Sequence, residues 1–186
     1  RQELILGNEW LVGNNADFNP LTNLSLDGAR LTYTSNDLSV DAFWMTLNEN
    51  FGSFGDNDAE LYGLYGTYTG VEDFEFNLYW LLVRDGVDIE DVRAVPLVER
   101  LENVFGVDDY KTTMMHTIGI RGAGTVGALD MEAEIAYQFG DAATVGATFT
   151  PFAYGDNNAS CGEWAGQFNL GYAFDMAWSP YIYLGG

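Results

Sequence analysis

The chain has 186 residues, of which 28 are acidic and 7 basic, and its formal net charge of -21 argues against a nucleic-acid partner, because phosphates are bound by Lys and Arg. Hydrophobic residues make up 47% of the sequence, which argues against a disordered chain, and no apolar run is long enough for a transmembrane helix. The single cysteine, Cys161, excludes an intrachain disulfide.

Apolar and polar residues alternate along most of the chain, with the period of two that is typical of β-strands. In chain order this pattern predicts nine strands, at 2–12, 27–35, 38–48, 60–69, 73–84, 115–123, 128–139, 163–174 and 177–185. Long connections at 14–25, 50–58, 86–114 and 140–162 alternate with tight turns near 36, 71, 125 and 176. This order is typical of an antiparallel up-and-down meander with loops at one rim and turns at the other.

The segment 128–139 shows the alternation most clearly. One face carries Leu129, Met131, Ala133, Ile135, Tyr137 and Phe139, and the other carries Asp130, Glu132, Glu134 and Gln138. Strands of this length suffice to cross a bilayer, which takes roughly 9–11 residues. A wholly apolar, aromatic-rich face then indicates lipid outside and a water-filled lumen inside. We therefore expect an all-β fold, an antiparallel up-and-down transmembrane β-barrel, as one incomplete domain over residues 1–186.

Two alternatives place the apolar faces inside a soluble or surface-attached protein. One is a structural or adhesive β assembly on the cell surface without transport. The other is a lipocalin-like binder, in which Phe74, Leu78, Phe168 and Leu170 would surround a ligand.

Several motifs occur in an order that resembles the alginate-export family of outer-membrane barrels in Gram-negative bacteria. They are "RQELILGNEWLVG" at 1–13, "SLDGARL" at 25–31, "HTIGIRGAG" at 116–124, "LDMEAEIAYQFG" at 129–140, and "GYAF" followed by "WSPYIYLGG". The resemblance implies an outer-membrane channel of about eighteen strands, of which this chain supplies about half, passing a saccharide or another small polar solute. It departs from the family at Trp10, where the first motif has an arginine.

The polar faces of the predicted strands supply the candidate lumen-lining residues. They are Arg30, Asp41, Glu75, Arg121, Asp130, Glu132, Glu134, Gln138, Gln167 and Asn169. Five of these side chains are acidic and two are basic, and acidic linings favour cations. The alginate exporter's pore is lined with arginine, which suits a polyuronate, so we expect a cation-leaning lumen here and do not carry over the alginate substrate.

The hairpin that joins 115–123 to 128–139 predicts a specific pairing. A turn centred near 125–126 places Arg121 opposite Asp130 and Gly119 opposite Glu132. This pair is either a structural strut or a contact for the solute.

Other features point to no catalysis and no resident cofactor. The only histidine, His116, shares a face with Ile118 and Ile120 and has no partner at zinc spacing, which indicates an interfacial position. No nucleophile with its base is found, so we do not expect an enzyme.

The acidic segments 55–60 and 155–160 are either solvated turns or weak sites for divalent cations. Within 86–114, "PLVERLENVF" is either a short helix that constricts the pore or a segment packed on neighbouring loops.

Overall fold

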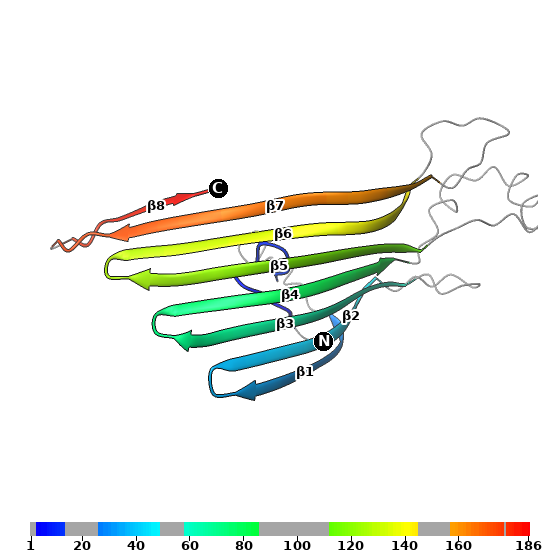
Figure 1. Cartoon of the computed structure of the whole chain (residues 1–186), viewed down its shortest axis with the longest axis horizontal. Coiled ribbons are helices and arrows are strands. Elements are labelled where there is room, and N and C mark those ends of the chain that lie inside the picture. The colour runs from blue at the N-terminus through cyan, green and yellow to red at the C-terminus, as the bar shows by residue number, and fades with distance from the viewer. Residues whose placement is uncertain (1–2, 14–25, 49–57, 86–111, 145–156, 177) are drawn as a thin grey trace, which may run out of the picture.

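The computed structural model describes residues 3–13, 26–48, 58–85, 112–144, 157–176 and 178–186. The strands among these residues form a single antiparallel sheet in which each strand pairs with the next along the chain (Figure 1). The eight strands are β1 (Asp27–Ser35), β2 (Leu38–Asn48), β3 (Ala59–Val71), β4 (Phe74–Asp85), β5 (Thr113–Val126), β6 (Leu129–Thr144), β7 (Asn157–Ala173) and β8 (Tyr181–Gly185). The predicted all-β, up-and-down architecture is confirmed. None of the described residues forms a helix with the length and apolar character that crossing a membrane requires.

Burial on this sheet runs opposite to that of a soluble β-protein. Glu134 and Ile135 are consecutive in β6, yet the carboxylate residue is 8% exposed and the isoleucine is 48% exposed. We call the side of the sheet that carries Asp130, Glu132 and Glu134 the polar face, and the side that carries Met131, Ala133 and Ile135 the apolar face. Large apolar side chains exposed to the surroundings gather on the second, as expected for a surface that meets hydrocarbon.

Aromatic residues divide the apolar face into levels. A row of aromatic rings in contact crosses four strands, with ring centroids 4.6–5.9 Å apart; it comprises Trp80, His116, Phe139, Tyr137 and Trp164. A second group lies nearer the turns and comprises the pairs Phe74–Phe76 and Tyr172–Phe174. Between them lies an aliphatic row in register, formed by Leu78, Ile120 and Ile135. This succession resembles the aromatic girdles that flank the apolar band of outer-membrane barrels.

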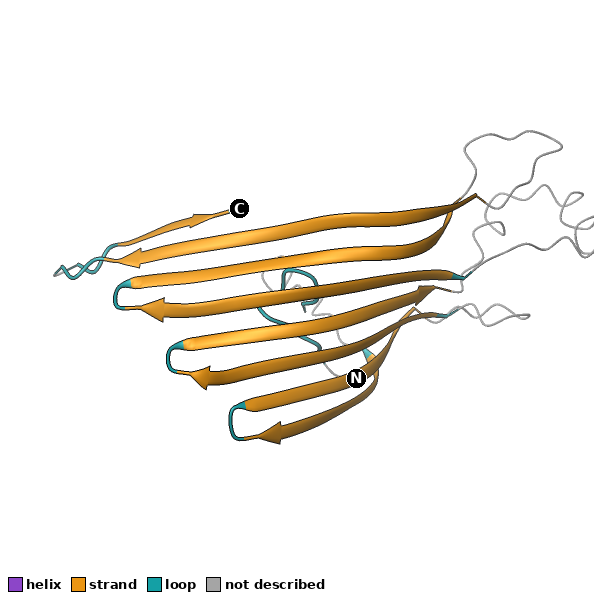
Figure 2. Cartoon of the chain, viewed as in Figure 1, coloured by secondary structure: helices purple, strands orange, loops and turns teal. Residues whose placement is uncertain are grey.

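The connections obey the predicted alternation. Hairpin turns at 36–37, 72–73 and 127–128, and residues 174–176 and 178–180 between β7 and β8, all lie at one rim of the sheet (Figure 2). The first three have a residue with positive φ, Asn36 (34°), Asp73 (62°) and Gly127 (64°), as tight hairpin turns require. The strand ends at Asn48, Asp85 and Thr144 lie at the opposite rim. The segments 49–57, 86–111 and 145–156 lie outside the described residues, and with them the whole expected helical segment and residues 55–57 and 155–156 of the two expected divalent-cation segments.

The predicted first strand, 2–12, is wrong. Residues 3–13 form no ladder with the sheet but close on themselves, because the Leu6 amide donates to the Val12 carbonyl (3.0 Å) and the Glu9 amide to the Leu6 carbonyl (3.1 Å). Gly7 and Glu9 have positive φ, which breaks an extended strand. The alternation that suggested a strand has another cause: Leu4 and Leu6 are buried and Ile5 is exposed.

This N-terminal segment covers part of the polar face. Leu4, only 2% exposed, and Leu6 lie in one apolar cluster with side chains from β2, β3, β4 and β6. The cluster also contains Leu26, Phe43, Met45, Leu61, Tyr65, Tyr79, Leu81 and Ala136. The polar face is therefore divided into an apolar sector under residues 3–13 and a polar sector formed by β4–β8.

The register of the β5–β6 hairpin also differs from the prediction. The turn lies at Gly127–Ala128, so Arg121 stands opposite Glu134 and Thr125 opposite Asp130. The predicted turn, centred near 125–126, lies too close to the N-terminus, because Gly127 was placed beside the turn. In the structure Gly127 is the turn residue that adopts positive φ. The partner of Arg121 moves by an even number of residues, so every side chain keeps its face and only the pairing changes.

Strands β6 and β7 extend beyond their predicted limits, to Thr144 and back to Asn157. Pairs such as Gly140–Cys161 and Thr144–Asn157 continue the ladder there. Apolar and polar residues alternate in the sequence only where one face of the strand meets lipid. Beyond the apolar band the alternation disappears, although the strand and its hydrogen bonds continue.

Candidate functional site

Arg121 of β5 is the centre of a polar network on the polar face. Its Nε donates to Glu132 Oε1 (2.5 Å), and its Nη1 donates to Glu75 Oε1 (2.9 Å) and Asn77 Oδ1 (2.8 Å). The side chain is 11% exposed, so these charge-assisted bonds form with little competition from solvent. Asn77 in turn donates to Thr67 Oγ1 (3.1 Å), which satisfies its amide group inside the network.

The predicted pair Arg121–Asp130 is not formed. Asp130 instead accepts hydrogen bonds from the hydroxyls of Thr125 (2.7 Å) and Tyr181 (3.2 Å). The register described above explains this. Arg121 lies opposite Glu134, which is four residues from Asp130 along β6, and its side chain reaches diagonally to Glu132.

Glu134 forms the second part of the network. Its carboxylate accepts from the Tyr79 hydroxyl (2.8 Å) and from Gln167 Nε2 (3.1 Å). Tyr79 is stacked on Tyr65, with ring centroids 5.8 Å apart, so the donor is held by the apolar sector next to it. Within the described residues neither Glu134 nor Asp130 has an ion-pair partner.

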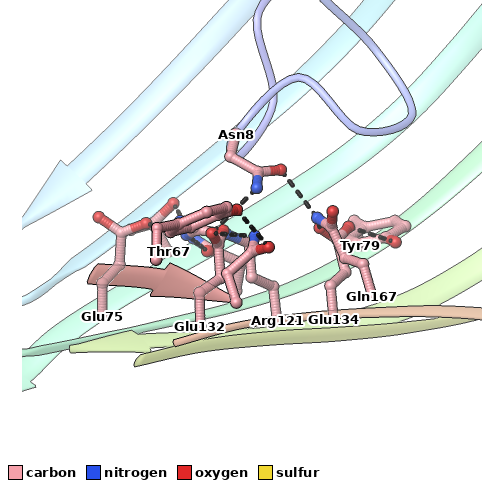
Figure 3. A network of polar contacts seen from close by, with 11 residues as sticks. Asn8, Thr67, Glu75, Tyr79, Arg121, Glu132, Glu134 and Gln167 are labelled. Atoms are coloured by element: carbon pink, nitrogen blue, oxygen red, sulfur yellow. Dashed lines mark hydrogen bonds and ion pairs between the residues drawn. The ribbon is translucent and has the colours of Figure 1, made fainter. Parts of the chain in front are cut away.

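The N-terminal segment is tied into this network through Asn8 (Figure 3). Its Nδ2 donates to Glu132 Oε2 (2.9 Å), and its Oδ1 accepts from Gln167 Nε2 (2.9 Å). Next to it, Gly7 approaches Arg121 so closely that a Cβ would lie 3.0 Å from the arginine Cδ, and its φ of +58° is one that glycine adopts without strain. The amide side chain thus bridges β6 and β7 from above the sheet.

The remaining predicted lumen residues occupy the same face but lie elsewhere or at the edge of the network. Arg30 of β1 and Asp41 of β2 form a bidentate ion pair of their own (2.9 and 2.7 Å), and Thr32 also donates to this carboxylate. Gln138 donates to Thr117 Oγ1 (3.3 Å). Asn169 joins the network by donating to Glu132 Oε2 (3.1 Å).

Sequence reasoning missed several members of the network, among them Asn8, Thr67, Asn77 and Tyr79. The positions of Asn77 and Tyr79 were visible, since they alternate with Leu78 and share the face of Glu75. Asn8 could not be found by alternation, because its contacts to Glu132 and Gln167 join residues more than a hundred positions apart.

In the described part of the sheet, the apolar face carries a polar cluster next to the rim of the long connections. Glu60 accepts from Trp44 Nε1 (2.9 Å), Tyr62 Oη (2.8 Å) and Arg84 Nη1 (3.2 Å). His116 lies on the same face, as predicted, where it accepts from Trp80 Nε1 (3.2 Å). Among the described residues, no group of three His, Cys, Asp or Glu side chains is placed to hold a metal ion.

Comparisons with known proteins identify the family. The family model for alginate export matches residues 1–185, essentially the whole chain. Searches of the curated proteins and of the solved structures gave no match. The match agrees with the up-and-down sheet, the exposed apolar face and the polar network opposite it. The chain belongs to the alginate export family, whose members are outer-membrane β-barrel channels of Gram-negative bacteria.

Proposed function

We propose that this chain forms part of a passive outer-membrane channel whose polar face conducts cations and uncharged polar solutes in preference to anions. The ten predicted lumen residues would line this path. The observation that carries the proposal is the arrangement of charge: both arginines of the polar set are already bound to carboxylates, whereas Asp130 and Glu134 accept only from neutral donors among the described residues.

The balance of charges on the polar face decides whether the channel prefers cations or anions. Arg30 is neutralised by Asp41, and Arg121 lies between Glu75 and Glu132. The excess of acid therefore remains, and no arginine of the set is left to attract a carboxylate or sulfate on the solute. An acidic lining concentrates cations and repels polyanions.

The two edges of the sheet are an argument for a larger, closed structure. β1 and β8 are the outermost strands of the described sheet. Unpaired backbone groups cannot face hydrocarbon, because no water is available there to satisfy them. We therefore propose that both edges pair with further strands, so that the polar face encloses a lumen.

The test is the reversal potential of the purified full-length protein in planar bilayers under a KCl gradient. Cation preference is expected, weaker at high salt because screening shortens the range of the acidic residues. The double variant D130N/E134Q removes two negative charges and should reduce the preference. The matched control R30Q/D41N removes one charge of each sign and should leave it unchanged. Anion preference in the unchanged protein would overturn the proposal.

A further inference from the structure

A groove lies on the polar face at the turn rim, next to the Arg121 network, with which it shares Glu132 and Asn169. Its volume is about 300 Å³, near the lower limit for small-molecule sites, which leaves room for one sugar-sized unit. Its walls come from β5–β8 and include Thr125, Asp130, Glu132, Asn169, Tyr181 and Tyr183.

Two tyrosines of β8 form the apolar wall of this groove. A Cβ at Gly171 would overlap Tyr181 Oη and Cζ, so this phenol ring crosses directly over the glycine backbone. Tyr183 lies over Gly185 in the same way, with its Oη 2.6 Å from the Cβ position. The rings are 52% and 61% exposed, so each offers an open surface on the side away from its glycine.

Hydrogen bonds fix both rings in this orientation. The Tyr181 hydroxyl donates to Asp130 Oδ2 (3.2 Å) and the Tyr183 hydroxyl to Asn169 Oδ1 (2.5 Å). Because the hydroxyl protons are used within the protein, what remains for a ligand is the electron-rich ring face and the acceptor lone pairs of the hydroxyl oxygen.

The polar groups of the groove have acceptor capacity to spare. A carboxylate offers about four lone-pair positions. Asp130 accepts two hydrogen bonds, both from neutral hydroxyls, and within the described residues no cation contacts it. Asn169 uses its Nδ2 on Glu132. The groove therefore suits a ligand that brings several hydroxyl donors and no negative charge.

We propose that this groove is a binding subsite for an uncharged saccharide. The C–H face of a sugar ring lies on Tyr181 and Tyr183, and its hydroxyls donate to Asp130 and to the free lone pairs of Asn169 and Glu132. A quaternary ammonium ion fits less well, because such ions are held by rings on several sides, whereas both rings here lie on one wall. The subsite extends the proposed function, since it needs a water-filled path to this face.

Block of the ion current through the full-length protein by sugars tests the subsite. Maltotriose, an uncharged trisaccharide, should reduce the current in a concentration-dependent way, and trigalacturonate, its anionic counterpart, should block at least about tenfold more weakly, which is a free-energy difference of about 1.4 kcal/mol. The variant Y181A/Y183A should weaken the maltotriose block at least about tenfold by removing both ring faces. Y33A removes an exposed tyrosine from the apolar face and should leave the block unchanged.

Each alternative outcome overturns the subsite. These are equal block by the two trisaccharides, no block by either, stronger block by choline than by maltotriose, or a block that Y181A/Y183A leaves intact. The reversal potential recorded in the same bilayers keeps this result separate from the proposed function: cation preference without sugar block overturns the subsite alone, and sugar block with anion preference overturns the selectivity proposal alone.

Discussion

Arg121 stands directly opposite Glu134 in the β5–β6 ladder, yet its guanidinium contacts Glu132, two residues nearer the turn. Glu75 and Asn77 on β4 draw the guanidinium in that direction, and Tyr79 and Gln167 occupy the carboxylate of Glu134. A cross-strand position therefore does not decide the ion pair here. The competing donors and acceptors on the strands at either side decide it.

Removal of this arginine should destabilise the sheet. Arg121→Gln leaves Glu132 and Glu75 without their cation and should lower the free energy of unfolding by about 1.5–3 kcal/mol, the range for hydrogen bonds to charged groups. Arg121→Lys keeps the charge but loses the planar fork and should give a smaller loss. Urea titration of the protein in lipid vesicles measures both. An unfolding midpoint that is the same for Arg121→Gln as for the unchanged protein would contradict the role of the network.

Most of the fold could be predicted from the sequence, because contact with lipid on one face makes apolar and polar residues alternate regularly. Where one face meets hydrocarbon and the other meets polar groups, as at Glu134 and Ile135, alternation assigns every side chain to a face. Eight of the nine predicted strands are confirmed, and the family and its outer-membrane location exclude the lipocalin-like binder. Leu78 and Phe168, placed around a ligand in that alternative, are exposed on the apolar face.

The candidate site could be predicted less well from the sequence. Residues 3–13 alternate like a strand because Leu4 and Leu6 enter the apolar cluster, and periodicity does not distinguish that cause from pairing in a sheet. The pairing of Arg121 depended on which residue of "AGTVGA" takes the positive φ, and an error of this kind changes partners without changing faces. The Asn8 bridge is a tertiary contact with no local signal.

A charge placed on the apolar face should destabilise the protein strongly in a bilayer. Ile135 lies in the aliphatic row between the two aromatic groups, so Ile135→Arg should cost roughly 2–4 kcal/mol, the range for a cation near the bilayer midplane. Gln138→Arg, on the polar face of the same strand, is the matched control and should be far milder. Folding titrations into lipid vesicles compare the two. Equal losses would contradict the assignment of the faces.

Accessibility in intact cells should differ between the two rims. With Cys161 replaced by alanine, a cysteine at Thr112, an exposed residue at the rim of the long connections, should react with a membrane-impermeant maleimide. A cysteine at Asn36, in the tight β1–β2 turn, should react only after the outer membrane is permeabilised, because short turns face the periplasm in such barrels. Labelling of Asn36→Cys in intact cells would reverse the orientation.

The N-terminal segment should narrow the conducting path, because it lies against the polar face and is tethered to Glu132 and Gln167 through Asn8. Leu4→Ala and Leu6→Ala each remove an anchor from the apolar cluster, at a cost of up to about 2–5 kcal/mol for a buried leucine. The double variant L4A/L6A should therefore release the segment, raise the single-channel conductance in symmetric KCl and expose residues 3–13 to protease. Ile5→Ala truncates the exposed side chain between them and should change neither readout.

A second variant keeps this prediction testable if the double variant does not fold. Asn8→Ala removes the two bridging hydrogen bonds while Leu4 and Leu6 stay anchored, so it should raise the conductance by less than L4A/L6A and leave the unfolding midpoint nearly unchanged. Protease digestion separates a released segment from an unfolded sheet, because cleavage confined to residues 3–13 leaves the rest of the chain intact. If both N8A and a folded L4A/L6A conduct like Ile5→Ala, the segment lies outside the conducting path, and the groove at Tyr181 and Tyr183 is reached without passing it.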